Sequence, residues 1–215
     1  MQRHLGVLML DTRFPRVAGD AGNPQSWPMP VRFAVVQGAS ARRVVHEGDP
    51  ALLKPFIDAA QRLVEAGAAA ITTSCGFLVQ FQAALQAALP VPVWTSSLLK
   101  LRELESPGVI TVDAQSLTAA HLLAASARAD TPVEGLTPGC SLQTTLLDDL
   151  PQMDTTAAEL DVTAAALRLV RRVPAVRSLV LECTNMPPYA AAVQRATGRP
   201  VHHLLSLVTE RWNLL

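Results

Sequence analysis

Two stretches carry the strongest evidence for the fold: Ile71-Thr72-Thr73-Ser74-Cys75 and Leu179-Val180-Leu181-Glu182-Cys183. Each begins with β-branched or aliphatic residues, which favour a buried strand, and each ends in a cysteine. Each is also followed by a segment with a helical pattern. Two such similar strand ends about a hundred residues apart indicate that the chain consists of two related halves.

The segments around these stretches support an internal repeat, because they match one another in the same order in both halves. The matching pairs are Gly6-Val7-Leu8-Met9-Leu10-Asp11 with Gly108-Val109-Ile110-Thr111-Val112-Asp113, Val36-Gln37-Gly38 with Val133-Glu134-Gly135, Arg62-Leu63-Val64 with Arg168-Leu169-Val170, Phe81 with Tyr189, and Pro92-Val93 with Pro200-Val201. Each match is weak by itself, but their shared order is hard to produce by chance. The repeat therefore predicts two domains of the same construction.

The periodicity along the chain predicts alternating strands and helices. Strands are expected at 5–11, 33–38, 69–74, 91–95, 108–113, 131–135, 177–182 and 200–205, and helices at 50–66, 77–89, 97–105, 116–128, 155–172, 187–197 and in the tail 206–215. Such alternation is typical of parallel sheets. We predict an α/β protein of two pseudo-symmetric domains, each a mainly parallel sheet flanked by helices, with the active site between them. The expected domains are 1–97, joined by the returning C-terminal segment 199–215, and 98–198.

The segment 14–31 interrupts this pattern, because it carries Gly19, Gly22, Pro24, Pro28 and Pro30 and shows no periodicity. A long loop directly after a strand end often covers a site. We interpret it as a flap, with a surface excursion of no particular role as the alternative.

Composition excludes several functional classes. The 215 residues carry a formal net charge of zero and no basic cluster, so no nucleic-acid partner is expected. No apolar run approaches the roughly 20 residues that span a bilayer, and the N-terminus does not resemble a signal peptide. Three cysteines in a chain of this length do not form a disulfide framework. We therefore expect a cytoplasmic protein with reduced thiols and no membrane partner.

Lysine usage argues against pyridoxal phosphate as a cofactor. The chain has two lysines, Lys54 and Lys100, and neither lies beside a glycine-rich segment that could cradle a phosphate. A zinc site is also not expected, because there is no close cysteine pair and the side chains of His202 and His203 would point to opposite faces of a strand. We expect an enzyme that needs neither a cofactor nor a metal.

Cys75 and Cys183 are the candidate catalytic groups. In open α/β sheets, ligands bind beyond the carboxyl ends of the strands, where both cysteines are expected. Each immediately precedes a helix, and the unpaired N–H groups of a helix start lower the pKa of a thiol and bind carboxylates. Two equivalent thiols facing one cleft suit inversion of a carbon centre, because one can take a proton from one face while the other supplies a proton to the opposite face.

The motifs Ser74-Cys75-Gly76 and Glu182-Cys183-Thr184-Asn185 resemble the two cysteine motifs of the aspartate/glutamate/hydantoin racemase superfamily. The resemblance covers essentially the whole chain. It implies cofactor-free proton abstraction beside a carboxylate or carbonyl, with Cys75 and Cys183 as acid and base, a site between the domains and often a homodimer. By motif match it also implies a set of substrate-binding residues: Asp11, Thr12, Thr73, Ser74, Gly76, Thr184 and Asn185.

The chain departs from the glutamate racemase pattern at both motifs. Those enzymes read Cys-Asn-Thr at the first motif, where this chain has Cys75-Gly76-Phe77, and Cys-Thr-His at the second, where this chain has Asn185. The expected substrate is therefore a small carboxylate or carbonyl compound, with a hydantoin or a substituted malonate as plausible as an amino acid. The superfamily also contains maleate cis–trans isomerases and arylmalonate decarboxylases, which provide an alternative isomerase or decarboxylase function.

Other interpretations stay open at this stage. Cys75 and Cys183 could be inert core thiols, or one could be the nucleophile of a Cys-His hydrolase, and two lobes around a cleft also describe non-catalytic binding proteins. Asp11 could hydrogen-bond backbone N–H groups instead of substrate. Arg13 and Arg16 could clamp a carboxylate, but solvated loop charges are the more ordinary interpretation. Cys140 has no partner in the repeat, and a structural role is expected for it.

Overall fold

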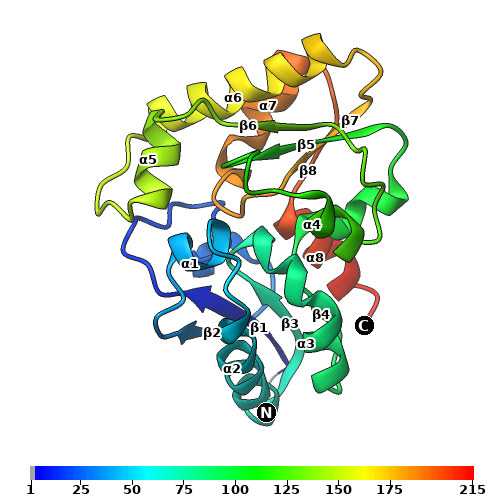
Figure 1. Cartoon of the computed structure of the whole chain (residues 1–215). Helices are drawn as coiled ribbons and strands as arrows, with labels where there is room; N and C mark the ends of the chain where they lie inside the picture. The colour runs from blue at the N-terminus through cyan, green and yellow to red at the C-terminus, as the bar shows by residue number, and fades with distance from the viewer. Residues whose placement is uncertain (1–2) are drawn as a thin grey trace.

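Two four-stranded parallel sheets form the framework of the protein (Figure 1). The computed structural model describes residues 3–215. The first sheet has the order β2-β1-β3-β4 and the second the order β6-β5-β7-β8. The strands are β1 His4–Leu10, β2 Val31–Val36, β3 Ala68–Thr73, β4 Val93–Trp94, β5 Pro107–Thr111, β6 Val133–Gly135, β7 Ser178–Leu181 and β8 Val201–His202. The identical strand orders confirm the predicted α/β fold with two pseudo-symmetric sheets.

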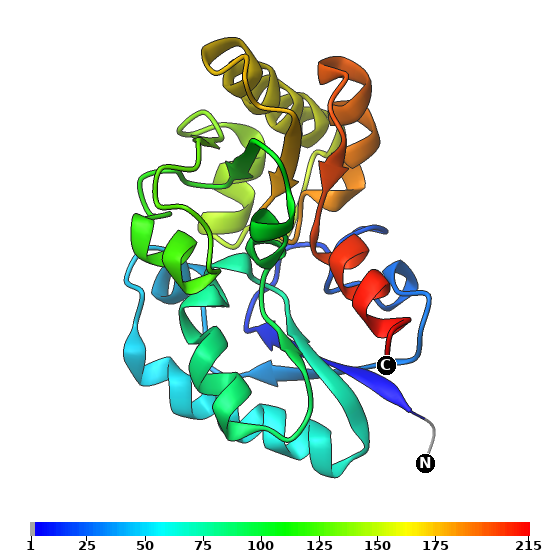
Figure 2. The same ribbon diagram turned by 90° about the vertical axis from the view of Figure 1, so that its right-hand side faces the viewer.

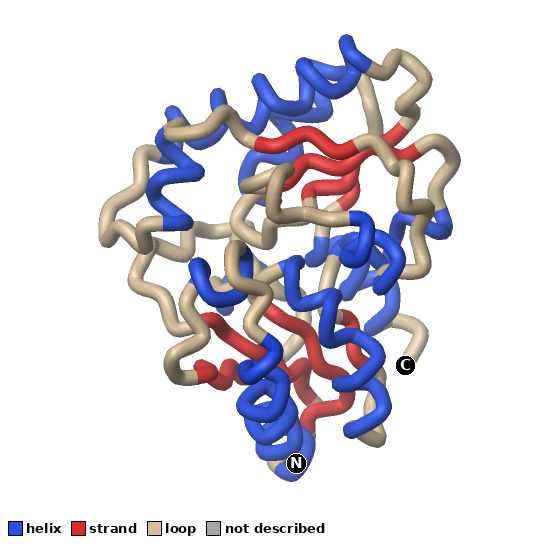
Figure 3. Tube along the Cα trace, viewed as in Figure 1, coloured by secondary structure: helices blue, strands red, loops and turns tan. Residues whose placement is uncertain are grey.

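Eight α-helices and five 3-10 helices complete the described part of the chain. The α-helices are α1 Ala41–Val45, α2 Leu53–Glu65, α3 Gln82–Ala88, α4 Ala119–Ala124, α5 Ser141–Leu147, α6 Thr155–Arg172, α7 Ala190–Thr197 and α8 Leu204–Trp212, and the 3-10 helices are η1 Pro24–Ser26, η2 Pro50–Leu52, η3 Gly76–Phe81, η4 Ser97–Glu103 and η5 Pro187–Tyr189. In Figure 3 the helices lie around and between the two sheets. Helix α2 packs on β1, β2 and β3, and α6 packs on β5 and β6.

Two equivalent glycines let the long helices approach the sheets closely. A Cβ atom at Gly6 would lie 3.1 Å from a methyl carbon of Leu63 on α2, and one at Gly108 would lie 2.8 Å from a methyl carbon of Leu169 on α6. Such distances are shorter than an ordinary van der Waals contact. The matched Gly and Leu positions of the repeat are therefore packing positions, which explains why both halves retain them.

The secondary structure differs from the prediction mainly at the ends of elements. The expected helix at 77–89 is 3-10 in its first part, η3, and α-helical in its second part, α3, while 97–105 is the 3-10 helix η4. Helices α1 and α5 were not among the predicted elements, because each spans only one or two turns and shows little periodicity.

The C-terminal segment returns to the first half later than expected. Strand β8 pairs in parallel with β7 and completes the second sheet, just as β4 pairs with β3 in the first. The predicted assignment of 199–215 to the first domain is therefore wrong for β8, because β8 occupies the position that the repeat gives it.

Helix α8 then lies against η4 and near the start of β1 (Figure 2). Lys100 on η4 bonds to Glu210 at 2.8 Å, and Arg211 bonds to Glu103 at 2.9 Å. The guanidinium of Arg3 lies 4.5 Å from the ring centre of Trp212. Across residues 3–215, no helix is both long enough and apolar enough to cross a membrane.

Candidate active site

A narrow cavity of about 30 Å³ contains both candidate catalytic cysteines. Its walls come from both halves of the chain and are mostly apolar. The lining residues are Leu10, Phe14, Ala41, Val45, Ser74, Cys75, Gly76, Phe77, Val112, Leu146, Leu147, Glu182, Cys183, Thr184 and Asn185. The structure therefore places the two cysteines, which are 108 positions apart in the chain, on one small cavity at the carboxyl ends of β3 and β7.

Cys75 is held by the polar residues that end β3. Its backbone N–H donates to Thr73 Oγ1 at 3.3 Å, and Thr73 Oγ1 donates to the carbonyl of Thr95 at 2.7 Å. Ser74 Oγ accepts a hydrogen bond from the backbone N–H of Leu10 at 3.0 Å. Cys75 is the N-cap residue of η3 in an extended conformation. The hydroxyl groups therefore fix the strand end from which the thiol projects, and Thr73 acts behind the cavity wall.

Cys183 occupies the equivalent position after β7, and its loop is tied directly to that of Cys75. Thr184 Oγ1 donates to the carbonyl of Ser74 at 2.6 Å. The Cys183 thiol lies 3.4 Å from Asn185 Oδ1 and donates to it. Because Thr184 bridges the two strand ends, it holds the two cysteine loops in a fixed relative position.

Both thiols have raised pKa values. Burial raises the pKa of Cys75 to about 12, and the nearby carboxyl of Glu182 acts in the same direction, while the backbone N–H groups of Phe77 and Leu78 and the charge of Arg16 oppose them. Burial and Glu182 also raise the pKa of Cys183 well above its usual value. The backbone N–H groups at the helix starts do lower the pKa of the thiols, as expected, but desolvation raises it by more. The expectation of a lowered thiol pKa is thus corrected.

Glu182 is a buried carboxyl between these groups that the sequence prediction left without a role. Its side chain is 0% exposed, and burial raises its pKa to about 8. Oε2 accepts a hydrogen bond from Thr111 Oγ1 at 2.8 Å, whereas Oε1 has no hydrogen-bond partner among residues 3–215. The signal in the sequence was a charged residue at the end of a buried strand, in the position equivalent to Ser74.

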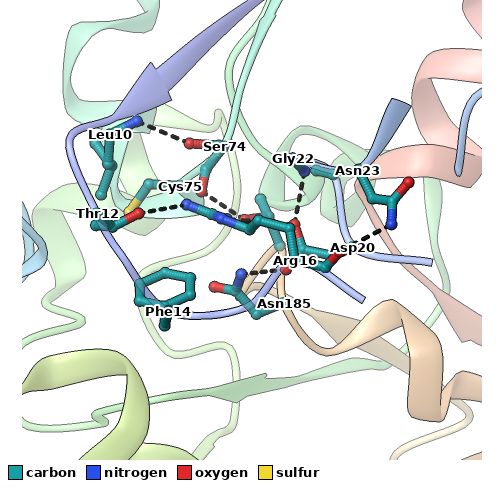
Figure 4. Close-up of polar contacts among 12 residues, drawn as sticks. Leu10, Thr12, Phe14, Arg16, Asp20, Gly22, Asn23, Ser74, Cys75 and Asn185 are labelled. Atoms are coloured by element: carbon teal, nitrogen blue, oxygen red, sulfur yellow. Dashed lines mark hydrogen bonds and ion pairs between the residues drawn. The ribbon is translucent and has the colours of Figure 1, made fainter. Parts of the chain in front are cut away.

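The loop after β1 contributes a second buried ionic group (Figure 4). The side chain of Arg16 is 13% exposed and donates to Thr12 Oγ1 at 2.9 Å and to Asp20 Oδ1 at 3.2 Å. Its guanidinium lies 4.3 Å from the ring centre of Phe14, which lines the cavity. The interpretation of Arg16 as a solvated loop charge is therefore wrong. It holds for Arg13, whose side chain is 76% exposed.

The same loop reaches across to the second cysteine motif. Asp20 accepts a hydrogen bond from Asn185 Nδ2 and another from the backbone N–H of Gly22 at 2.6 Å. The backbone N–H of Ala21 donates to the carbonyl of Thr184 at 3.2 Å. Desolvation raises the pKa of Asp20, although Arg16 opposes the shift. The contacts of the loop with the Cys183 motif agree with the interpretation of 14–31 as a flap.

The predicted substrate-binding residues fall into two groups. Ser74, Gly76, Thr184 and Asn185 line the cavity with the two cysteines, while Asp11, Thr12 and Thr73 do not. Asp11 is exposed, and its carboxylate accepts a hydrogen bond from the backbone N–H of Gly38 at 3.0 Å. Thr12 positions Arg16, as described above. Asp11 therefore binds a backbone N–H group, which is the alternative to substrate binding that the sequence left open.

The third cysteine and the metal-binding groups lie apart from this site. Cys140 is half-buried at the start of α5 and is not part of the cavity wall. Among residues 3–215, no cluster of three or more histidine, cysteine, aspartate or glutamate side chains could hold a metal ion.

Solved structures that are similar to this one include a decarboxylase and two racemases. Unliganded arylmalonate decarboxylase superposes with a TM-score of 0.61 at 20% identity, covering 93% of this chain and 86% of that chain. Allantoin racemase from Pseudomonas fluorescens gives 0.60 at 16% identity, covering 99% and 90%, and Picrophilus torridus aspartate racemase gives 0.53 at 12% identity, covering 93% and 88%. The chain has the two-domain fold of the aspartate/glutamate/hydantoin racemase superfamily.

The sequence is similar to proteins named as lyases, whereas the similar structures are named as racemases and a decarboxylase. Dimethylsulfoniopropionate lyase 6 of Emiliania huxleyi (strain CCMP1516) is 30% identical over 92% of this chain and 56% of its own length. Dimethylsulfoniopropionate lyase of Durusdinium sp. clade D is 28% identical over 92% of this chain and 70% of its own length. The chain thus spans little more than half of the first of these relatives. No model of a protein family matches the chain.

Proposed function

We propose that this protein removes a proton from a carbon next to a carboxylate without a cofactor, using Cys75 and Cys183 as the acid–base groups. The observation that carries the proposal is that two buried thiols from equivalent strand ends line one small cavity. Thiols on walls from both halves can act on opposite faces of one bound carbon. The polar side chains of Ser74, Thr184 and Asn185 beside them provide groups for the substrate oxygens.

The reaction that we propose is β-elimination from a β-sulfonio carboxylate such as dimethylsulfoniopropionate. One thiolate takes a proton from the carbon next to the carboxylate, and the electrons of that C–H bond form the C=C bond of acrylate. The bond between Cβ and sulfur breaks, and its electron pair leaves on sulfur as dimethyl sulfide. The net products are dimethyl sulfide, acrylate and the proton held by the thiol. Support comes from the relatives named as lyases of this compound.

The electrostatics of the site also favour a substrate that carries its own positive charge. At pH 7, ionising a thiol whose pKa is about 12 costs about 7 kcal/mol. A sulfonium group beside the thiolate would lower this pKa, because an opposite charge within a few ångströms stabilises the ionised form. A sulfonium also needs no hydrogen-bond acceptors. The apolar walls formed by Phe14, Phe77 and Leu146 therefore suit its methyl groups.

Arg16 reduces the electrostatic cost of bringing the substrate carboxylate close to Cys75. Its guanidinium is nearly buried in the flap, and its charge lowers the pKa of Cys75. It is already paired with Asp20, so it reduces the electrostatic cost of an incoming anion without attracting any anion strongly. This balance suits a substrate that is zwitterionic overall.

Racemisation or epimerisation of a carbon next to a carboxylate or carbonyl is the second candidate function. It is favoured by the origin of the two thiols in different halves of the chain, which is the arrangement that inversion requires. The likeness in fold to allantoin racemase and aspartate racemase is consistent with it.

The test compares both reactions in the same protein. The purified chain would be incubated with dimethylsulfoniopropionate, with release of dimethyl sulfide measured by gas chromatography. In parallel, single enantiomers of aspartate, glutamate and substituted hydantoins would be followed in D₂O for α-proton exchange and loss of optical rotation. Cys75→Ser and Cys183→Ser are the test variants, and Cys140→Ser is the matched control.

We expect dimethyl sulfide release that falls by a factor of roughly 10² to 10⁴ in one or both test variants and is unchanged in the control. Racemisation without elimination would identify the second candidate as the correct one. Full activity in the Cys75→Ser/Cys183→Ser double variant would contradict both.

A further inference from the structure

We propose that Glu182 is a further catalytic residue, which stays protonated and donates a hydrogen bond from Oε1 to a carboxylate oxygen of the substrate. The bond strengthens as negative charge builds on that oxygen during removal of the α-proton. The inference rests on the proposed function, because it assumes a carboxylate substrate in the cavity between Cys75 and Cys183.

The first observation is that one oxygen of Glu182 is held and the other is unused. Thr111 Oγ1 donates to Oε2 at 2.8 Å, which fixes the orientation of the carboxyl group. Oε1 is fully buried and makes no hydrogen bond within residues 3–215, although Glu182 lines the same cavity as both thiols. A buried polar atom without a hydrogen-bond partner destabilises the folded protein. A substrate oxygen bound in this cavity would remove that destabilisation.

The second observation concerns Gly76. A Cβ atom at position 76 would overlap both Oε1 and the backbone oxygen of Glu182. The Glu182 carboxyl therefore fills the space that a side chain at 76 would take, directly after Cys75. Glutamate racemases carry an asparagine at this point of the motif, and this chain lacks that polar group. Glu182 supplies a polar group at the same place from the opposite half of the chain.

The third observation is the shortage of positive charge around the carboxyl. The titratable groups that interact with it are the thiols Cys75 and Cys183, and neither is a cation. Arg16, which acts on Cys75, is already paired with Asp20. Burial disfavours the carboxylate and raises the pKa of Glu182 to about 8, so the neutral acid predominates at pH 7. A neutral carboxyl can donate a hydrogen bond, which a carboxylate cannot.

Two substitutions separate hydrogen-bond donation from the other possible roles. Glu182→Gln keeps a donor and can still accept from Thr111, whereas Glu182→Leu removes both functions at similar volume. Glu65→Gln is the matched control, because Glu65 is an exposed residue at the end of α2. Binding of propionate, an unreactive carboxylate, would be measured by titration calorimetry in all four proteins, so that the test does not depend on turnover.

We expect propionate to bind to Glu182→Gln within about threefold of the wild type and to Glu182→Leu about 10- to 100-fold more weakly, as expected for the loss of a hydrogen bond to a charged group. In the wild type, the affinity should fall as the pH rises through about 8, because the ionised carboxyl then repels propionate. The affinity of Glu182→Gln should lack this decrease. Difference infrared spectra at pH 6 should show a protonated carboxyl band in the wild type that is absent from Glu182→Gln.

Three results would overturn the inference. They are wild-type affinity for propionate in Glu182→Leu, absence of propionate binding to the wild type at every pH, and a wild-type infrared spectrum without the Glu182 band. If Glu182→Gln binds propionate normally but loses all turnover, Glu182 transfers a proton, and its assignment as a donor is wrong. The failure of the proposed function looks different, because no protein would then turn over substrate while the propionate and infrared results stayed as expected.

Discussion

Replacing Glu182 by glutamine should make the stability of the protein much less sensitive to pH. The carboxyl has an ordinary pKa of 4.5 when the chain is unfolded and a pKa of about 8 in the folded protein. Between these two values the folded state holds one proton more than the unfolded state, so the free energy of unfolding decreases as the pH rises. The contribution of the protonated Glu182 carboxyl to the free energy of unfolding is fully present below pH 4.5 and is lost by about pH 8.

The magnitude follows from the two pKa values. Each pH unit between them lowers the free energy of unfolding by about 1.4 kcal/mol, so the wild type should lose about 3 kcal/mol by pH 7 and about 5 kcal/mol above pH 8, relative to pH 4.5. Glu182→Gln has the same shape and no ionisation. Its stability relative to the wild type should therefore increase by these amounts over the same pH range.

Urea unfolding of the wild type, Glu182→Gln and the control Glu65→Gln at several pH values from 5 to 9 would measure this difference. Effects of other ionisable groups are common to all three proteins, so they cancel in the comparison. A difference between wild type and Glu182→Gln that stays constant across this range would refute the reasoning, because it would mean that Glu182 ionises in the folded protein as it does in the unfolded chain.

Three further predictions concern packing, the buried ion pair and the thiols. Gly76→Ala should lower the free energy of unfolding by about 1–3 kcal/mol, measured by chemical denaturation, because its methyl group would overlap Glu182. Asp20→Ala should cost about 3–5 kcal/mol in the same assay, since it leaves the nearly buried Arg16 without its partner, and a loss below about 1 kcal/mol would contradict this. Iodoacetamide at pH 7 should label Cys140 before the two cavity cysteines, which mass spectrometry of peptides would show. Burial raises the pKa of all three thiols, but Cys140 is only half-buried, whereas the cavity thiols are buried.

The internal repeat made the fold predictable from the sequence. The match between Gly6 and Gly108 marks equivalent helix contacts, and the match between Pro92 and Pro200 marks equivalent edge strands. Cys75 and Cys183 could be placed at one site because equivalent strand ends lie at the same edge of each sheet. The match of Pro200 with Pro92 also implies that β8 pairs with β7 as β4 pairs with β3, but the predicted return of the whole segment 199–215 to the first half did not apply it.

The remainder of the site depends on contacts between distant parts of the chain. Asp20 meets Asn185 across 165 positions, and Thr111 meets Glu182 across 71, so no local pattern reports either contact. The direction of the thiol pKa shifts was also mispredicted, because helix starts can be recognised in a sequence but the burial of Cys75 cannot. Sequence reasoning thus brought Cys75 and Cys183 to one cavity and missed the ionic groups that lie near them.

The size of the cavity has a consequence for the kinetics. A volume of about 30 Å³ holds roughly one or two water molecules, which is less than any carboxylate of three or more carbons requires. This arrangement therefore excludes bulk solvent but does not admit a substrate, and walls of the cavity such as the segment 14–31 must move apart before each encounter. Binding energy spent on closing them again lowers the apparent affinity. Turnover of such an enzyme would be limited by opening or by release, and solvent viscosity would then slow it.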